Sequence, residues 1–412
     1  MPVHRRRLTT AVACAVMLIG SAAGATGAVA AAPARPSVAH PQHQSGRGAL
    51  LHAELLYTLK TREAVAAELT EAGFDGSQTR HGVDAYRLTY RTVDPQGRPT
   101  TASGLLALPR GKGGRLRAVS FAHGTGSHRS DAPSMQRGTF LTGPPVTYAS
   151  AGFAAVAPDY LGMGTGPGAH PWMHVPSEAT ASLDLLRAAR AFRSLDRKVL
   201  VTGFSQGASA ALGLGRALQA GEDRYFRLGA LAPISGAYDF GGAELPALLA
   251  GELDRKSSVI YAAYTLVAFN RVHRVYDSPD QVFQNPAVEV LFDGEHTGRQ
   301  LFEGTPDSLD ALLTPYGLDL LAHPRGGLVD ALRETDSVCR DWAPRVPVRL
   351  YMAGGDEQAT TANTAHCVDS LLRKGVEAKV VDLSAVDHGG SRHLGSNVRG
   401  TVEVLRWFRQ LG

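Results

Sequence analysis

The pentapeptide "GFSQG" at residues 203–207 places Ser205 between Gly203 and Gly207. A serine hydroxyl becomes a nucleophile when a tight turn between a strand and a helix exposes it beside a general base. The run "KVLVT" before the motif is strand-like, and "ASAALGLGRALQA" after it has the composition of a helix. The two glycines would let the turn pass close to neighbouring elements. This context predicts that Ser205 is a nucleophile, which the pentapeptide alone would not.

A serine nucleophile on such a turn needs an acid and then a histidine downstream. Asp356 follows the strand-like run "VPVRLYMAGG", and His388 lies in the loop after "VEAKVVDLS". Both would project from the sheet edge that carries Ser205. We therefore predict His388 as the base and Asp356 as the acid that holds its imidazole.

Other residues could fill these roles. Asp387 adjoins His388, which makes an aligned contact between carboxylate and imidazole awkward. His366 and His393 are expected on or beside helices, facing solvent. Asp159 follows a strand but precedes Ser205, contrary to the required order, so it is expected to be structural or to line the pocket.

Acyl transfer also requires donors for the developing oxyanion. The loop "FAHGTG" ends an earlier predicted strand and offers the backbone N–H groups of Thr125 and Gly124. Gln206, directly after the nucleophile, offers a second donor. These three residues are the predicted oxyanion hole.

The sequence predicts a disulfide and no metal site. Cys339 and Cys367 are the two cysteines outside the N-terminal 32 residues, and an even pair in an exported protein favours a disulfide. Neither cysteine sits in a Cys-x-x-Cys pair. His170 and His174 have i, i+4 spacing, but Pro171 and nearby glycines argue against a continuous metal-binding helix, and both histidines stay unassigned.

The order of elements indicates an α/β fold. Apolar repeats at helical spacing predict an N-terminal helix over residues 50–73, and two alternating runs joined by "PQGRP" predict an antiparallel hairpin. Short apolar runs separated by helical stretches then predict a mostly parallel sheet with helices on both faces. The predicted strands lie within the runs at residues 116–126, 152–164, 198–207, 228–239, 346–357 and 376–384.

About 100 residues without a strand separate two of these runs, which is too long for an ordinary connection. We predict a helical cap insertion at residues 239–338 within a core of residues 49–238 and 339–412. Its segment "SVIYAAYTLVAFN" is too apolar for a free surface helix, so it is expected to line an acyl pocket with Tyr261, Tyr264 or Phe269.

The N-terminus is typical of a secretory signal peptide over residues 1–32, followed by a leader at residues 33–48. Three arginines precede a short apolar run, which is too short to span a bilayer. Their removal would leave 39 basic and 38 acidic residues. This balance gives no electrostatic reason to bind nucleic acid. We expect a secreted protein.

The motifs together resemble the α/β-hydrolase superfamily, in particular the secretory lipase family and its bacterial lipase and esterase relatives. The resemblance covers residues 84–412 and rests on "HGTG", "PDYLGMG", "AHPW", "GFSQGA" and "DHGG" in this order. It implies a serine hydrolase of acylglycerols or other carboxylic esters that needs no metal or organic cofactor. It also implies that the insertion covers the acyl pocket and could contact a lipid interface. With only two cysteines outside the signal, the chain departs from the fungal members.

Two other functions remain open. A secreted serine peptidase or aminopeptidase would use the same triad, although such enzymes commonly place acidic side chains near the serine. An inactivated hydrolase fold could also serve as a binding protein. The physiological ester and the oligomeric state do not follow from the sequence.

Overall fold

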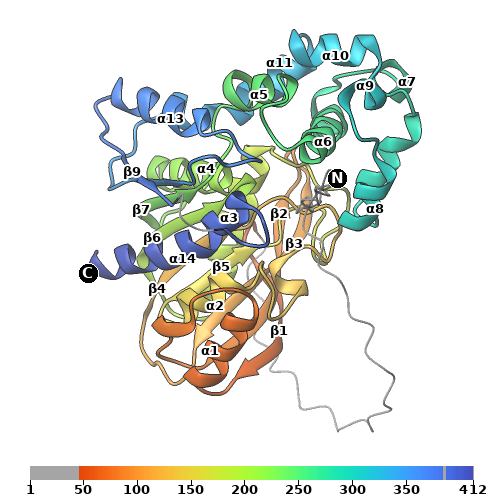
Figure 1. Ribbon diagram of the computed structural model, residues 1–412. Helices are drawn as coiled ribbons and strands as arrows, with labels where there is room; N and C mark the ends of the chain where they lie inside the picture. The colour runs from red at the N-terminus through yellow and green to blue at the C-terminus, as the bar shows by residue number, and fades with distance from the viewer. Residues whose placement is uncertain (1–45, 384–386, 412) are drawn as a thin grey trace, which may run out of the picture.

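The computed structural model describes residues 46–383 and 387–411. Its centre is a nine-stranded sheet with the order β1-β2-β3-β5-β4-β6-β7-β8-β9 (Figure 1). The first three strands and the β3–β5 pair are antiparallel, and all other pairs are parallel. The predicted mostly parallel sheet is confirmed. The strands are β1 Leu50–Leu59, β2 Val83–Val93, β3 Pro99–Pro109, β4 Leu116–Ala122, β5 Ala154–Pro158, β6 Leu195–Phe204, β7 Arg227–Ile234, β8 Arg349–Met352 and β9 Lys379–Asp382.

The predicted hairpin is confirmed as β2 and β3, which pair in unbroken register from Val83 opposite Pro109 to Val93 opposite Pro99. The predicted helix over residues 50–73 is wrong in its first half, which forms β1. This strand pairs with β2, but register shifts between Leu50 and His52 and between Leu55 and Tyr57 break the two-residue alternation. These shifts leave apolar side chains at a spacing that imitates a helix.

Two layers of helices cover the sheet. On one face, α1 (Arg62–Glu71), α2 (Gly143–Ser150) and α14 (Arg392–Gln410) contribute to one apolar cluster. On the other face, α3 (Val175–Phe192) and α4 (Gln206–Ala220) pack with α12 (Ser337–Arg340) and α13 (Ala362–Leu372). Two short 3-10 turns, η1 (Gly76–Gln78) and η2 (Pro133–Met135), lie in connecting loops. The predicted disulfide is present between Cys339 of α12 and Cys367 of α13, and it links the two ends of a segment that contains β8.

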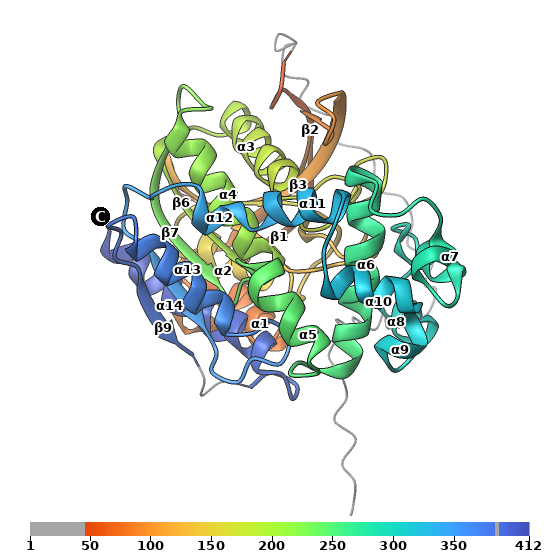
Figure 2. The same ribbon diagram turned by 90° about the horizontal axis from the view of Figure 1, so that it is seen from above.

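The residues between β7 and β8 are helical and lie together at the top of Figure 1. Figure 2 shows α7 to α10 gathered at one side of the sheet. We call residues 239–338 the insertion. Its helices are η3 Phe240–Glu244, α5 Leu245–Leu249, α6 Arg255–His273, α7 Pro279–Val282, η4 Pro286–Phe292, α8 Gly298–Gly304, α9 Leu309–Leu312, α10 Pro315–Ala322 and α11 Gly327–Thr335, and α12 begins at its end.

Helix α6 is the centre of the insertion. It begins at Asp254, whose carboxylate accepts a hydrogen bond from the Ser257 N–H, and ends at Arg274 in the left-handed conformation. Thirteen of its residues are buried, and the nine apolar ones belong to a cluster with neighbouring helices of the insertion and with Trp172 and Met173 of the core. Within the described ranges, every helix is too short or too polar to cross a membrane.

Candidate active site

Ser205 lies on the turn between β6 and α4, at the carboxyl edge of the parallel strands. Its backbone has φ 56° and ψ −123°, a strained conformation for a residue with a side chain. A Cβ atom on Gly203 would lie 2.1 Å from the Gly207 carbonyl oxygen, and one on Gly207 would lie 2.1 Å from that of Ala122. The turn can therefore form only with glycine at both positions, which explains the spacing of the pentapeptide.

The imidazole beside Ser205 belongs to His393. Its Nε2 lies 2.9 Å from the Ser205 hydroxyl oxygen, and its Nδ1 lies 2.8 Å from Oδ2 of Asp356. Because the carboxylate can only accept, Nδ1 carries the proton and Nε2 accepts from Ser205. His393 is only 2% exposed and its ring packs against Phe204. Ser205, His393 and Asp356 form a hydrogen-bonded triad.

Asp356 occupies the turn after β8, as its place in the sequence suggests. Its Oδ1 accepts hydrogen bonds from the backbone N–H groups of Gln358 and Ala359, both at 2.9 Å, while Oδ2 faces the imidazole. The side chain is 1% exposed. These hydrogen bonds fix the orientation of the carboxylate.

The prediction that His388 lies beside Ser205 is wrong. His388 pairs with Ser391 in a short antiparallel bridge closed by two glycines with positive φ, and its ring packs against Phe140 and Gly73. The chain reverses at this bridge before α14 begins at Arg392. The histidine beside Ser205 therefore comes after the turn at residues 388–391, five residues later in the sequence than predicted.

His393 was expected to face solvent, and this expectation is also wrong. In α14 the buried residues His393, Asn397, Val404 and Phe408 recur at helical spacing. His393 therefore belongs to the buried face of this helix. That pattern is the signal in the sequence that distinguishes the two histidines. His366 is half exposed on α13 and pairs with Asp239, and Asp387 accepts a hydrogen bond from Gly390.

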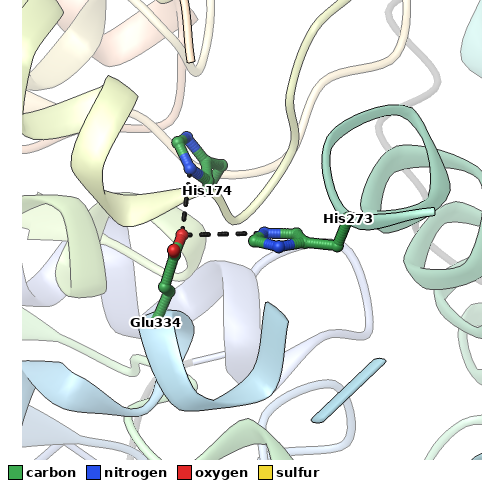
Figure 3. Close-up of side chains that lie close together, drawn as sticks. All are labelled: His174, His273 and Glu334. Carbon is green, nitrogen blue, oxygen red and sulfur yellow. Dashed lines mark ion pairs between the residues drawn. The ribbon is translucent and has the colours of Figure 1, made fainter. Parts of the chain in front are cut away.

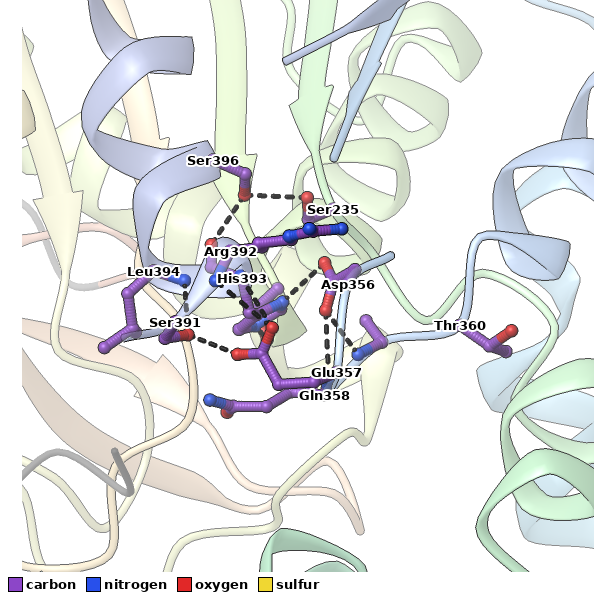
Figure 4. A network of polar contacts seen from close by, with 12 residues as sticks. Ser235, Asp356, Glu357, Gln358, Thr360, Ser391, Arg392, His393, Leu394 and Ser396 are labelled. Atoms are coloured by element: carbon purple, nitrogen blue, oxygen red, sulfur yellow. Dashed lines mark hydrogen bonds and ion pairs between the residues drawn. The ribbon is translucent and has the colours of Figure 1, made fainter. Parts of the chain in front are cut away.

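Glu357 holds the start of α14 (Figure 4). Its carboxylate accepts hydrogen bonds from the Ser391 hydroxyl and from the backbone N–H groups of Arg392 and His393. The first N–H groups of a helix have no partner within it, and their partial positive charge favours an anion. Sequence reasoning missed Glu357, whose position next to Asp356 couples the acid of the triad to the helix that carries His393.

The electrostatics of His393 suit proton transfer. Burial acts to lower the pKa of the ring, but the charge and the hydrogen bond of Asp356 outweigh this, and Glu357 and Glu244 add to the effect. The pKa of His393 is therefore raised above its ordinary value. The same aspartate stabilises the protonated ring that forms when Ser205 gives up its proton.

The predicted oxyanion residues surround the serine. Thr125 lies in the loop after β4, the strand that pairs with β6, and lines the cavity beside Ser205. Within the described part of the chain, the backbone N–H groups of Thr125 and Gln206 have no hydrogen-bond partner. A Cβ atom on Gly124 would lie 3.3 Å from that of Ser205, so the loop passes close to the nucleophile.

A buried polar cluster anchors Gln206. Its side-chain amide donates to His170 Nε2 at 2.9 Å and to Glu178 Oε1 at 2.7 Å, while His170 Nδ1 donates to the Leu161 carbonyl. Burial raises the pKa of Glu178 to about 8, so this carboxyl is mostly uncharged at neutral pH. These bonds fix the first turn of α4, whose N–H groups face the site.

The cavity beside Ser205 has walls from the core and from the insertion. Ile260, Tyr261, Tyr264, Gly298 and Leu301 contribute the wall from the insertion. Phe269 is outside the lining, since it packs in the insertion against Trp172 and Phe240. The space open to the centre of a water-sized molecule is only about 40 Å³. A long acyl chain would therefore need side chains of the insertion to move.

Hydrogen bonds tie the insertion to the site. The Tyr261 hydroxyl donates to Gln358 at 2.9 Å, next to the Asp356 turn, and the Asp254 N–H donates to the Glu357 carbonyl. Tyr264 donates to the Gly126 carbonyl and stacks on Trp172, whose indole in turn donates to Thr125. The position of α6 therefore affects both the acid turn and the predicted oxyanion loop.

No protein-family model matches the chain, and no curated protein sequence matches it. Solved structures do. The rice cell wall degrading esterase LipA from Xanthomonas oryzae is similar, with 27% identity, a TM-score of 0.76, and 88% of this chain and 98% of LipA covered. A putative hydrolase from Legionella pneumophila has 22% identity and a TM-score of 0.77, with 88% and 98% covered. Candida antarctica lipase A in its closed state has 15% identity and a TM-score of 0.64, with 89% and 82% covered.

Proposed function

Because the chain has the α/β-hydrolase fold and resembles esterases and lipases in structure, we propose that it is a serine ester hydrolase. The single observation that carries this proposal is the hydrogen-bonded row of Ser205, His393 and Asp356. A nucleophile, a base within 3 Å of it, and an acid that orients the base are the requirements for acyl transfer.

In the proposed reaction, the Ser205 oxygen attacks the ester carbonyl while its proton moves to Nε2 of His393. The N–H groups of Thr125 and Gln206 would bind the oxyanion of the tetrahedral intermediate. When the intermediate collapses, the carbon–oxygen bond to the leaving group breaks and His393 gives its proton to the alcohol. Water then attacks the acyl-enzyme with His393 again as base, which releases the carboxylic acid and restores Ser205.

The walls of the cavity favour an ester as substrate. The side contributed by the insertion is aromatic and aliphatic, and suits an acyl group or an apolar alcohol. One acidic residue, Asp131, also lines the cavity, and burial raises its pKa above the ordinary value. Its carboxylate already accepts bonds from the Ser127 and His128 N–H groups. A carboxyl that has a raised pKa and one oxygen already occupied is a poor site for the free amino group of a peptide.

The export of the protein remains part of the proposal. The signal peptide predicted at residues 1–32 and most of the leader at residues 33–48 lie outside the described residues. The buried disulfide between Cys339 and Cys367 fits an oxidising compartment. Contact of the insertion with a lipid interface is likewise proposed only.

The experiment that tests this function compares three substrate classes with the same purified enzyme: p-nitrophenyl esters of rising chain length, emulsified triacylglycerol and aminoacyl anilides. We expect hydrolysis of the esters, with the highest kcat/KM on short acyl chains because the cavity is narrow. Preferred cleavage of the anilides would replace the ester hydrolase with a peptidase. Absence of turnover and of fluorophosphonate labelling would favour a binding protein.

A further inference from the structure

Three side chains that the triad does not use meet where the insertion joins the core (Figure 3). His174 precedes the first turn of α3, His273 is the last residue of α6, and Glu334 lies in α11. They are the one group of this kind that the described residues contain, and none of them lines the cavity beside Ser205. The cluster thus combines one residue of the core with two from separate helices of the insertion.

The ligand atoms are close enough to share a cation. Oε2 of Glu334 lies 3.1 Å from Nε2 of His174 and 3.6 Å from Nε2 of His273, and all three ligand atoms lie within 4.8 Å of one another. Two ligands of a tetrahedral Zn²⁺, each about 2.1 Å from the ion, are about 3.4 Å apart. Small side-chain rotations would therefore bring the three atoms into the first coordination sphere of one ion.

The carboxylate of Glu334 lies within ion-pair distance of both imidazoles. Although two imidazole nitrogens are near, Oε2 of Glu334 is buried and accepts no hydrogen bond from the described residues. Buried carboxylate oxygens normally have a polar partner, and an oxygen that faces two imidazole nitrogens in this way can share a cation with them.

We propose that His174, His273 and Glu334 bind one divalent transition-metal ion, with Zn²⁺ as the best match to two imidazoles and one carboxylate. The side chains of both histidines are nearly buried, whereas that of Glu334 is 44% exposed. The ion can enter from the Glu334 side, and water can complete a tetrahedral sphere. The sequence analysis predicted no metal because the ligands come from three distant segments rather than from the His170 and His174 pair.

One existing contact must change when the ion binds. Nδ1 of His174 accepts a long hydrogen bond of 3.3 Å from the Ser177 N–H, which requires the ring proton on Nε2. A metal on Nε2 moves that proton to Nδ1. The Ser177 N–H keeps a partner, because it also donates to the His174 carbonyl at 3.0 Å.

The ion would fasten the insertion to the core. Next to Glu334, the Thr335 hydroxyl already donates to the Met173 carbonyl, so the ion would reinforce an existing contact between α11 and the start of α3. It would also fix the C-terminal end of α6, the helix that places Tyr261 and Tyr264 in the cavity wall. The expected role is structural, since the ligands lie outside the cavity.

Equilibrium dialysis of the chelator-treated protein against ZnCl₂ tests the site without reference to catalysis. We expect one Zn²⁺ per chain and a higher melting temperature with Zn²⁺ than without it. His273→Gln and Glu334→Gln should each weaken binding more than about 100-fold, because each removes a direct ligand. His323→Gln is the matched control, since His323 pairs with Asp319 at 3.0 Å on the surface of the insertion and belongs to no group of three such ligands among the described residues.

Circular dichroism of each variant without metal shows whether it is folded, so that a loss of binding can be distinguished from unfolding. Tetrahedral absorption bands of Co²⁺ bound to the wild-type protein, displaced by Zn²⁺, give a second measurement that needs no substitution. The proposal is overturned if the wild-type protein binds no Zn²⁺, or if the folded His273→Gln and Glu334→Gln variants bind it as the wild type and His323→Gln do.

Discussion

Two histidine and carboxylate clusters in this protein use the same side chains in different ways. At Asp356 both carboxylate oxygens are occupied, by two backbone N–H groups and by the His393 ring. At Glu334 one oxygen lies beside two imidazoles and accepts no hydrogen bond from the described residues. A saturated carboxylate holds a ring in one orientation and tunes its pKa, whereas an unsaturated one is available to a cation. The hydrogen bonds to each carboxylate thus distinguish the two clusters. The saturated Asp356 supports proton transfer by His393, whereas the unsaturated Glu334 can bind a metal ion together with His174 and His273.

The largest effect is expected where the saturated cluster meets the nucleophile. Ser205→Ala and His393→Ala should each lower kcat for ester hydrolysis by about 10⁴-fold or more, because the triad acts as a unit. His388→Ala is the matched control and should keep a rate close to that of the wild type. Steady-state kinetics on a p-nitrophenyl ester measure all three variants. If His388→Ala lost activity and His393→Ala kept it, the base would be His388, as predicted from the sequence.

Asp356→Asn should lower kcat by about 10³- to 10⁴-fold, because an amide no longer fixes the ring tautomer. Activity needs neutral His393, so it falls as the pH drops through the raised pKa of this ring. Loss of the carboxylate removes the main cause that raises this pKa, and the acid limb of the kcat/KM profile should move to lower pH. Asp387→Asn should change neither rate nor profile. An unchanged acid limb in Asp356→Asn would contradict this assignment.

Glu357 sharpens the comparison, because its carboxylate acts on the triad only through α14. Glu357→Gln should lower kcat by about tenfold with little change in KM, since the start of the helix is less well held. It should also shift the acid limb slightly to lower pH, because Glu357 contributes to the raised pKa of His393. Glu334→Gln, assayed without metal, is the control from the other cluster. A purely structural role for Glu357 would lower stability and leave the acid limb in place.

The smallest effect concerns the wall from the insertion. Leu301→Ala should raise the ratio of kcat/KM on longer to shorter acyl esters by about fourfold per methylene accommodated, since a buried methylene contributes about 0.8 kcal/mol. Leu320→Ala removes the same atoms from the core of the insertion but not from the cavity wall. The same change of ratio in both variants would show that loosening of the insertion, rather than cavity width, sets the preference.

Local patterns in the sequence were sufficient to predict most strands and helices of the core. Buried parallel strands appear as continuous apolar runs. The glycines of the Ser205 turn are required because a Cβ atom at either position would lie 2.1 Å from a backbone carbonyl oxygen. Strand β1 could not be recognised, because two register shifts remove its alternation and its pairing with β2 is a tertiary contact. An edge strand of this kind has no signal within its own residues.

The candidate site could be predicted for Ser205 and Asp356 but not for its histidine. Both His388 and His393 follow β9, and loop position alone favours the first. The choice depends on a chain reversal at residues 388–391 and on the buried face of α14, which are properties of the folded helix. The cluster at Glu334 joins residues separated by up to 160 positions, and so leaves no local motif.

The most direct test of the central claim is labelling with a fluorophosphonate, followed by mass mapping of the modified peptide. We expect one label per chain, on Ser205, with labelling much slower in His393→Ala and at the wild-type rate in His388→Ala. Modification of another serine, or loss of labelling in His388→Ala while His393→Ala reacts normally, would contradict the assignment of Ser205 and His393.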